Sequence, residues 1–159
     1  MKKHILIVGN CGSGKTWVMK EIIKNTGIRT NCKFNLIRFL LKDKLCLLGK
    51  YVGDTFDGSD KLSMAVSKDF VKFKKFVDEK DLTVICEGDR FTNKNFIQTF
   101  NPYIIKIKDD GKKGRIKRNS KQTEQHLKRI STRIKNVKED ILLDNSTSVL
   151  SLILNRINK

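Results

Sequence analysis

The fold is decided by one short stretch near the start of the chain, Gly9-Asn10-Cys11-Gly12-Ser13-Gly14-Lys15-Thr16. This stretch matches the phosphate-binding P-loop pattern G-x-x-x-x-G-K-[ST]. The apolar run 4–8 before it predicts a short buried strand, and residues 17–24 after it predict a helix. Strand, glycine-rich loop and helix, in this order, form the structural context that the motif requires, which a chance glycine turn would lack.

Each part of this stretch has a physical role toward phosphate. The glycine residues allow the backbone to curl, so that successive N–H groups point at an anion, and the start of the helix adds partial positive charge. Lys15 is long enough to reach the β- and γ-phosphates, and the Thr16 hydroxyl is suited to ligate Mg²⁺. The stretch therefore predicts that residues 9–16 bind ATP together with Mg²⁺.

Length and composition narrow the class of protein. The 159 residues predict one P-loop domain over 1–159. No apolar run reaches the roughly 18 residues of a membrane span, and the apolar run at the N-terminus is too short for a signal peptide. The 4 cysteines and 2 histidines lack metal-ligand spacing, which argues against a zinc site or a disulfide framework. A cytoplasmic protein is expected.

The chain is strongly basic. Its 34 Lys and Arg residues against 17 Asp and Glu residues give a net charge of +17. This excess suggests a polyanionic partner, with nucleic acid as the leading candidate. The charge could also have either of two simpler origins, because a lysine-rich genome produces basic proteins without a binding purpose, and a nucleotide enzyme needs cations near its phosphates.

Beyond the first helix, strand and helix patterns alternate. The expected elements are a β-hairpin-like insert, a helix, a strand, a short helix, a strand, a long helix and a last strand before the final helix, at residues 32–51, 62–77, 82–86, 91–100, 103–107, 120–137 and 141–143. A basic, glycine-punctuated segment at about 109–119 is expected to be a mobile lid. This order predicts an α/β, three-layer P-loop NTPase fold, with a mostly parallel five-stranded sheet and helices on both faces.

Two further stretches have the composition of a reaction site. The loop 51–60 concentrates aspartates in a basic protein, and Glu87-Gly88-Asp89-Arg90 follows a buried strand, where a Walker B carboxylate would assist Mg²⁺. A solvated turn is the alternative for the second stretch. Arg129 and Arg133 are four residues apart and share a helix face, which suits either a phosphate clamp or a solvated surface.

Together with the P-loop, residues 48–64, 85–91 and 120–132 resemble the bacteriophage P-loop kinases that phosphorylate 5-hydroxymethyluracil in DNA. The resemblance implies transfer of the γ-phosphoryl group of ATP to a hydroxyl group of a modified base in DNA, in the cytoplasm of an infected host cell if the protein is viral. A deoxynucleoside monophosphate kinase, which would act on a deoxynucleotide, is the alternative enzyme. A nucleic-acid-binding ATPase is a third possibility, disfavoured by the absence of a clear Asp-Glu pair after an apolar strand.

The kinase interpretation assigns roles to residues. Lys15 would hold the phosphates, and Thr16 would ligate Mg²⁺ with Glu87 or Asp89. Asp57 and Asp60 are the first candidates for the base that accepts the hydroxyl proton, and Asp89 is the third. Charge in the transition state would be neutralised by arginines of the lid and of the following helix, namely Arg129 and Arg133 with Arg115 or Arg118. The expected substrate-binding residues are Tyr51, Asp57, Ser59, Asp60 and Arg90.

Overall fold

The computed structural model describes residues 2–53 and 57–159, without the side chain of Asp60. Its strands are β1 (Ile5–Val8), β2 (Thr30–Phe34), β3 (Ile37–Lys42), β4 (Leu45–Leu48), β5 (Thr83–Glu87), β6 (Tyr103–Ile107) and β7 (Ile141–Leu143). Its α-helices are α1 (Lys15–Thr26), α2 (Phe70–Glu79), α3 (Lys94–Phe100), α4 (Lys112–Lys117), α5 (Glu124–Lys135) and α6 (Ser146–Ile157). Two 3₁₀ segments, η1 (Ser59–Lys61) and η2 (Met64–Asp69), precede α2.

The sheet contains seven described strands in the order β2-β3-β4-β5-β1-β6-β7. The strands from β4 to β7 in this order are parallel, and β2 and β3 join them by antiparallel pairing. The expected count of five strands is therefore wrong, because the insert does not stand apart as a hairpin but extends the sheet. The reason lies in its side chains, since Phe39 and Leu40 are buried on opposite faces and need cover on both.

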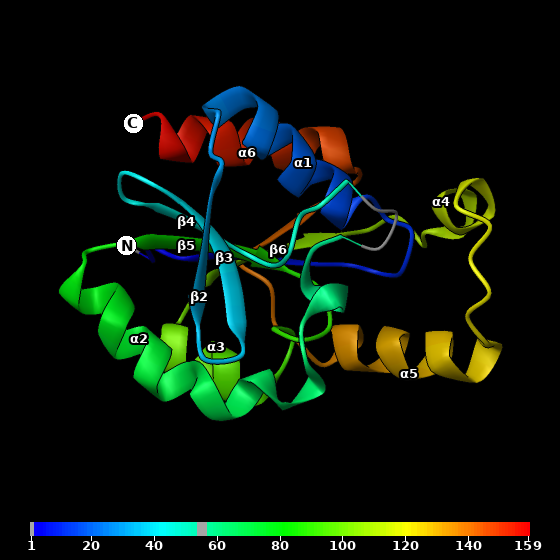
Figure 1. The fold of residues 1–159 in the computed structure, drawn as a ribbon. Coiled ribbons are helices and arrows are strands. Elements are labelled where there is room, and N and C mark those ends of the chain that lie inside the picture. Colours follow the sequence, from blue (N-terminus) through cyan, green and yellow to red (C-terminus); the bar gives the residue numbers. More distant parts are fainter. Residues whose placement is uncertain (1, 54–56) are drawn as a thin grey trace.

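Helices cover both faces of this sheet, as the sequence predicted. Along β1, Leu6 and Val8 pack into the cluster formed with α2, α3 and α5, whereas Ile5 and Ile7 pack into the cluster formed with α1 and α6. Figure 1 shows the resulting three layers, with α1 and α6 above the sheet and α2, α3 and α5 below it. The short helix α4 lies at one end of the molecule, beyond the edge of the layers (Figure 1).

Three predicted helices begin later than expected, and side-chain capping explains the start of two of them, α3 and α5. The expected helix 62–77 is a 3₁₀ segment up to Asp69 and becomes an α-helix only at Phe70. Helix α3 begins after Asn93, whose side chain accepts a hydrogen bond from the N–H of Phe96. Helix α5 begins after Thr123, which caps the N–H of His126, rather than at residue 120.

The region expected to be a mobile lid contains helix α4 in place of an irregular loop. Within the described part of the chain, no helix is both long enough and apolar enough to cross a membrane. Helix α1 ends at Thr26, and Gly27 after it adopts a left-handed conformation with φ of 70° and donates its N–H to the Ile23 carbonyl.

Candidate active site

The carboxyl ends of β1, β5 and β6 lie side by side, because these strands are parallel neighbours. A cavity of about 600 Å³ opens at this edge, and we call it the central cavity. In open α/β sheets, ligands bind in the crevice outside the carboxyl ends of the strands, at the point where the strand order reverses. The described residues that line it are Gly9, Cys11, Gly12, Ser13, Gly14, Lys15, Thr16, Trp17, Lys20, Glu87, Gly88, Asp89, Arg90, Thr92, Asp109, Gly114, Lys117, Arg118, Gln122, His126, Ile130, Arg133, Ile134 and Ser146.

The loop from Gly9 to Thr16, here the glycine loop, forms the floor of the central cavity. Gly12 and Gly14 have φ of 86° and 99°, which side-chain-bearing residues rarely adopt. Gly14 also has no room for a side chain, because an added Cβ would lie 2.7 Å from the Cβ of Ser146 at the start of α6. The hydroxyl of Ser13 is buried in this loop and has no hydrogen-bond partner among the described residues. This hydroxyl lies against Gly9, because a Cβ added at Gly9 would be 2.6 Å from its oxygen.

The side chain of Lys15 bends back over the glycine loop. Its ammonium group donates to the carbonyl oxygens of Gly9 at 2.8 Å and Asn10 at 2.9 Å. The ammonium group therefore lies against the loop that it is expected to serve, within reach of a ligand held by the loop N–H groups. The contacts with carbonyl oxygens are ones that a phosphate oxygen can replace.

Thr16 and Glu87 meet across the central cavity. The Thr16 hydroxyl, at the start of α1, donates to the carboxylate of Glu87 at 3.4 Å. Glu87 is the last residue of β5 and is buried, at 3% exposure. The sequence predicted both as ligands of Mg²⁺, and the structure brings them together.

Gly58 and Ser59, from the aspartate-rich loop 51–60, pack against the end of β5. Lys50 and Gly58 form an isolated antiparallel bridge, and a Cβ on Gly58 would lie 2.6 Å from the Glu87 carboxylate. Ser59 is buried so close to Gly88 that any side chain at Gly88 would collide with it. The two sequence stretches that carried the predicted acceptor side of the site are thus in direct contact.

Asp57 lies behind this contact rather than on the wall formed by the described residues of the central cavity. Its carboxylate is 1% exposed, accepts a hydrogen bond from Gly53 N–H at 2.7 Å, and lies 3.6 Å from the ammonium group of Lys20. Lys20 itself lines the cavity. The predicted side-chain role of Asp60 lies outside the described part of the structure. Tyr51 is also not among the described lining residues; its hydroxyl donates to the Leu48 carbonyl at 3.4 Å.

Asp89 and Arg133 form an ion pair on the cavity wall. It links the turn after β5 to the last turn of α5. Arg90 lies beside them and donates from Nε to the Leu62 carbonyl at 3.3 Å. Arg129, predicted to share the work of Arg133, is exposed and is not among the described residues lining the cavity. The side chains of α5 that line the cavity centre on Ile130, with His126 and Ile134 one turn away on either side and Arg133 at the margin, so that Arg129 lies beyond this margin.

Helix α4 packs directly on the glycine loop. Arg115 donates from Nη1 to the carbonyl oxygens of Cys11 at 2.7 Å and Asp110 at 2.8 Å. Gly114 lies so near Gly12 that a Cβ at this position would collide with the Gly12 carbonyl. Gln122 adds a contact from its amide nitrogen to the sulfur of Cys11 at 3.4 Å. These contacts bring Lys117 and Arg118 of the expected lid to the cavity wall.

Lys20, Gln122 and Ser146 line the cavity without having been predicted. Lys20 had a usable signal, because it lies four residues after Thr16 and therefore on the same face of the helix. Gln122 and Ser146 had none, since only the folded chain brings them to Cys11 and Gly14.

Cysteine chemistry is not indicated at β5, where burial raises the pKa of the Cys86 thiol well above its usual range and keeps it protonated.

No group of three or more His, Cys, Asp or Glu residues in the described chain could hold a metal by itself. The donor pair of Thr16 and Glu87 nevertheless suits Mg²⁺, which takes few protein ligands and completes its shell with water and substrate phosphates.

Comparisons with protein-family models, with curated proteins and with solved structures gave no match. Functional conclusions for this chain therefore depend on the side chains at the central cavity.

Proposed function

We propose that the chain is a P-loop kinase, which uses ATP and Mg²⁺ to transfer a phosphoryl group to a hydroxyl group. The observation that carries this proposal is the meeting of Thr16 and Glu87, at 3.4 Å, directly beside Lys15 on the glycine loop. A lysine, a hydroxyl and a buried carboxylate in this arrangement are the parts that P-loop enzymes use for phosphates and Mg²⁺. A glycine turn with a purely structural role would need neither the hydroxyl nor the buried carboxylate.

The donor side of the reaction uses the glycine loop. Lys15 exchanges its contacts with the Gly9 and Asn10 carbonyls for oxygens of the β- and γ-phosphates. The loop N–H groups donate to the same phosphates, and Arg118 also lines the central cavity. Thr16 and Glu87 are the residues that would hold Mg²⁺. The metal ion would neutralise the charge that develops on the phosphate oxygens.

On the acceptor side we assign the base to Asp89, because among the described side chains of the three candidate aspartates it is the one that lines the central cavity, whereas Asp57 is buried beside Lys20. The acceptor hydroxyl gives its proton to Asp89 while its oxygen forms a bond to the γ-phosphorus. The bond from this phosphorus to the β–γ bridging oxygen breaks, and ADP leaves. Arg133, which already contacts Asp89, stabilises the transferring group.

For the acceptor, we propose the hydroxymethyl group of 5-hydroxymethyluracil in DNA. This proposal follows the resemblance of residues 48–64, 85–91 and 120–132, and it gives the net charge of +17 a use against DNA phosphates. A base inside a duplex would have to be extruded to enter the cavity. A deoxynucleoside monophosphate is the second candidate, because Arg90 and Arg133 line the same cavity and suit a substrate phosphate.

The test supplies γ-labelled ATP with DNA containing 5-hydroxymethyluracil, with unmodified DNA of the same sequence, and with each deoxynucleoside monophosphate. Label on the modified DNA alone is the expected result. Label on monophosphates alone would assign the second function. ATP hydrolysis without label in any acceptor would contradict both kinase assignments.

A further inference from the structure

A second hollow, of about 820 Å³, opens beside the central cavity. We call it the side groove. It lies between η2, α3 and the end of α5, and it shares Asp89, Arg90, Thr92 and Arg133 with the central cavity. A molecule that extends out of the central cavity past these residues therefore enters the side groove.

The lining of the side groove is positively charged. The described lining residues include four cationic side chains, those of Arg90, Lys94, Arg133 and Lys138. They include one carboxylate, that of Asp89, which forms an ion pair with Arg133. Lys94 and Lys138 are exposed, and neither forms an ion pair within the described residues. The groove therefore presents at least two ammonium groups to whatever occupies it.

Neutral groups in the groove suit a nucleic acid better than an acidic peptide. Gln98 and Asn136 are exposed amides, which both donate and accept hydrogen bonds as base edges do. Met64, which is 73% exposed, and the partly buried Ile97 offer apolar surface to a base. Each nucleotide of a nucleic acid carries a phosphate for the lysines together with a base edge for the amides and a base face for the apolar surface, so one repeating unit matches all three kinds of group, whereas an acidic side chain supplies only a carboxylate.

We propose that the side groove binds the nucleic-acid strand on one side of the nucleotide whose base enters the central cavity, with its phosphates at Lys94 and Lys138. The inference rests on the proposed function for the identity of the central cavity. A free mononucleotide bound through its single phosphate at Arg90 and Arg133 would have no further phosphate to offer to Lys94 and Lys138. The side groove therefore favours a polymeric acceptor over the monophosphate alternative.

The test measures fluorescence anisotropy of a labelled single-stranded DNA of about 12 nucleotides, without ATP, over about 50 to 200 mM salt. The test variant is the double substitution Lys94→Ala and Lys138→Ala. Its matched control is Lys72→Ala and Lys75→Ala, which removes the same charge from the exposed face of α2. A slope of about 0.7 per single-strand phosphate corresponds to about fivefold in affinity per contact at 0.1 M salt. The groove variant should therefore lose up to about 25-fold and show a salt slope smaller by about 1.4, whereas the control should lose little.

Equal losses in the two double variants would overturn the location. Competition by polyglutamate as strong as that by DNA, at equal charge, would overturn the choice of nucleic acid. ATP binding, followed through the fluorescence of Trp17 in the central cavity, should be unchanged in the groove variant. A wild-type protein that binds DNA through these lysines but not ATP would contradict the proposed kinase and leave the groove assignment intact. A working kinase whose affinity for DNA is unchanged in the groove variant would support the proposed function and contradict the groove assignment.

Discussion

In this structure the ammonium group of Lys15 is held by two carbonyl oxygens of its own loop. In the proposed kinase, Lys15→Ala would remove a preorganised donor to the charge that develops on the phosphate. We expect turnover of ATP to fall by about 10²- to 10³-fold, the cost of losing one such donor. The measurement is kcat/KM for ATP, with Lys24→Ala, an exposed position further along the same helix, as the control. If Lys15→Ala kept more than about a tenth of the activity, the lysine would not contact the transferring phosphate.

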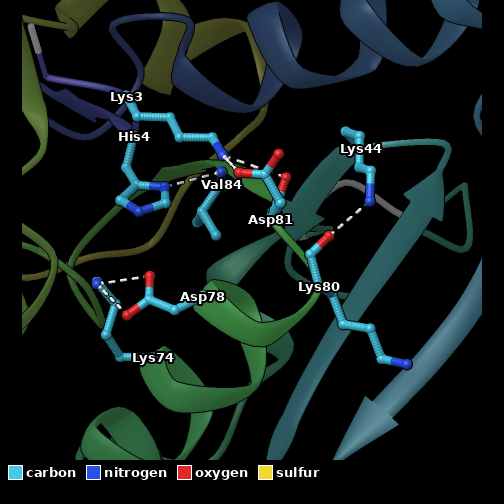
Figure 2. Close-up of polar contacts among 8 residues, drawn as sticks. All are labelled: Lys3, His4, Lys44, Lys74, Asp78, Lys80, Asp81 and Val84. Atoms are coloured by element: carbon cyan, nitrogen blue, oxygen red, sulfur yellow. Dashed lines mark hydrogen bonds and ion pairs between the residues drawn. The ribbon is translucent and has the colours of Figure 1, made fainter.

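His4 is a second residue with a measurable consequence, at the opposite end of the sheet. Its ring is buried, and Nδ1 accepts a hydrogen bond from the N–H of Val84 at 3.1 Å (Figure 2). Burial lowers the pKa of His4 from 6.5 to about 4, with help from the positive charges of Lys74 and Lys3, while Asp78 opposes the shift. The folded chain therefore keeps His4 neutral at pH values where the unfolded chain protonates it.

This difference predicts how stability depends on pH. Between about pH 6.5 and pH 4 the unfolded state binds more protons at His4, so the free energy of unfolding falls as the pH is lowered, by at most about 3 kcal/mol. Urea denaturation at intervals over this range measures the change. His4→Asn keeps an acceptor for Val84 but does not titrate, so its curve should be flatter. The aspartates with lowered pKa, such as Asp140, lose their contribution mainly at lower pH and remain in both proteins. Identical curves would contradict the assignment.

At the scale of elements, the strands with continuous apolar runs were predictable. Strands β6 and β7 agree with the expected ranges, β1 begins one residue later than expected, and β5 is displaced by one residue. Helix α4 was not predictable, because its sequence Lys-Lys-Gly-Arg-Ile-Lys has a glycine and no apolar stripe. Its conformation is supported by contact with the glycine loop, which is a long-range interaction. For the same reason, Lys15, Thr16, Glu87, Asp89 and Arg133 were predicted as site residues and line the central cavity, whereas Gln122 and Ser146 line it without having been predicted.

The close contact between α4 and the glycine loop can be tested by adding a side chain at Gly114. In an isolated helix, Gly114→Ala would be favourable by about 0.5 to 1 kcal/mol, but here the new methyl group would collide with the Gly12 carbonyl. We expect the collision to dominate, to displace α4, and to raise the KM for ATP severalfold. Hydrogen exchange at α4 should become faster in parallel. Lys113→Ala, on the exposed side of the same helix, is the control and should change neither quantity. Unchanged exchange and KM in Gly114→Ala would show that α4 is not held by this approach.

At the scale of the whole molecule, the central cavity takes its walls from the ends of β1 and β5, from α1 and from the segments of α4 and α5. A ligand that binds there contacts both helical layers and is lost on global unfolding. With Mg²⁺ and ATP at about 100 times the dissociation constant, binding should add about 2.7 kcal/mol to the free energy of unfolding. For a chain of this length, that corresponds to a rise in Tm of roughly 5 to 11 °C. Lys15→Ala should reduce the rise, and omission of Mg²⁺ should reduce it in the wild type, because Thr16 and Glu87 then have no cation to hold. A rise that was equal with and without Mg²⁺ would mean that this pair does not bind the metal, and it would move the metal site away from the end of β5.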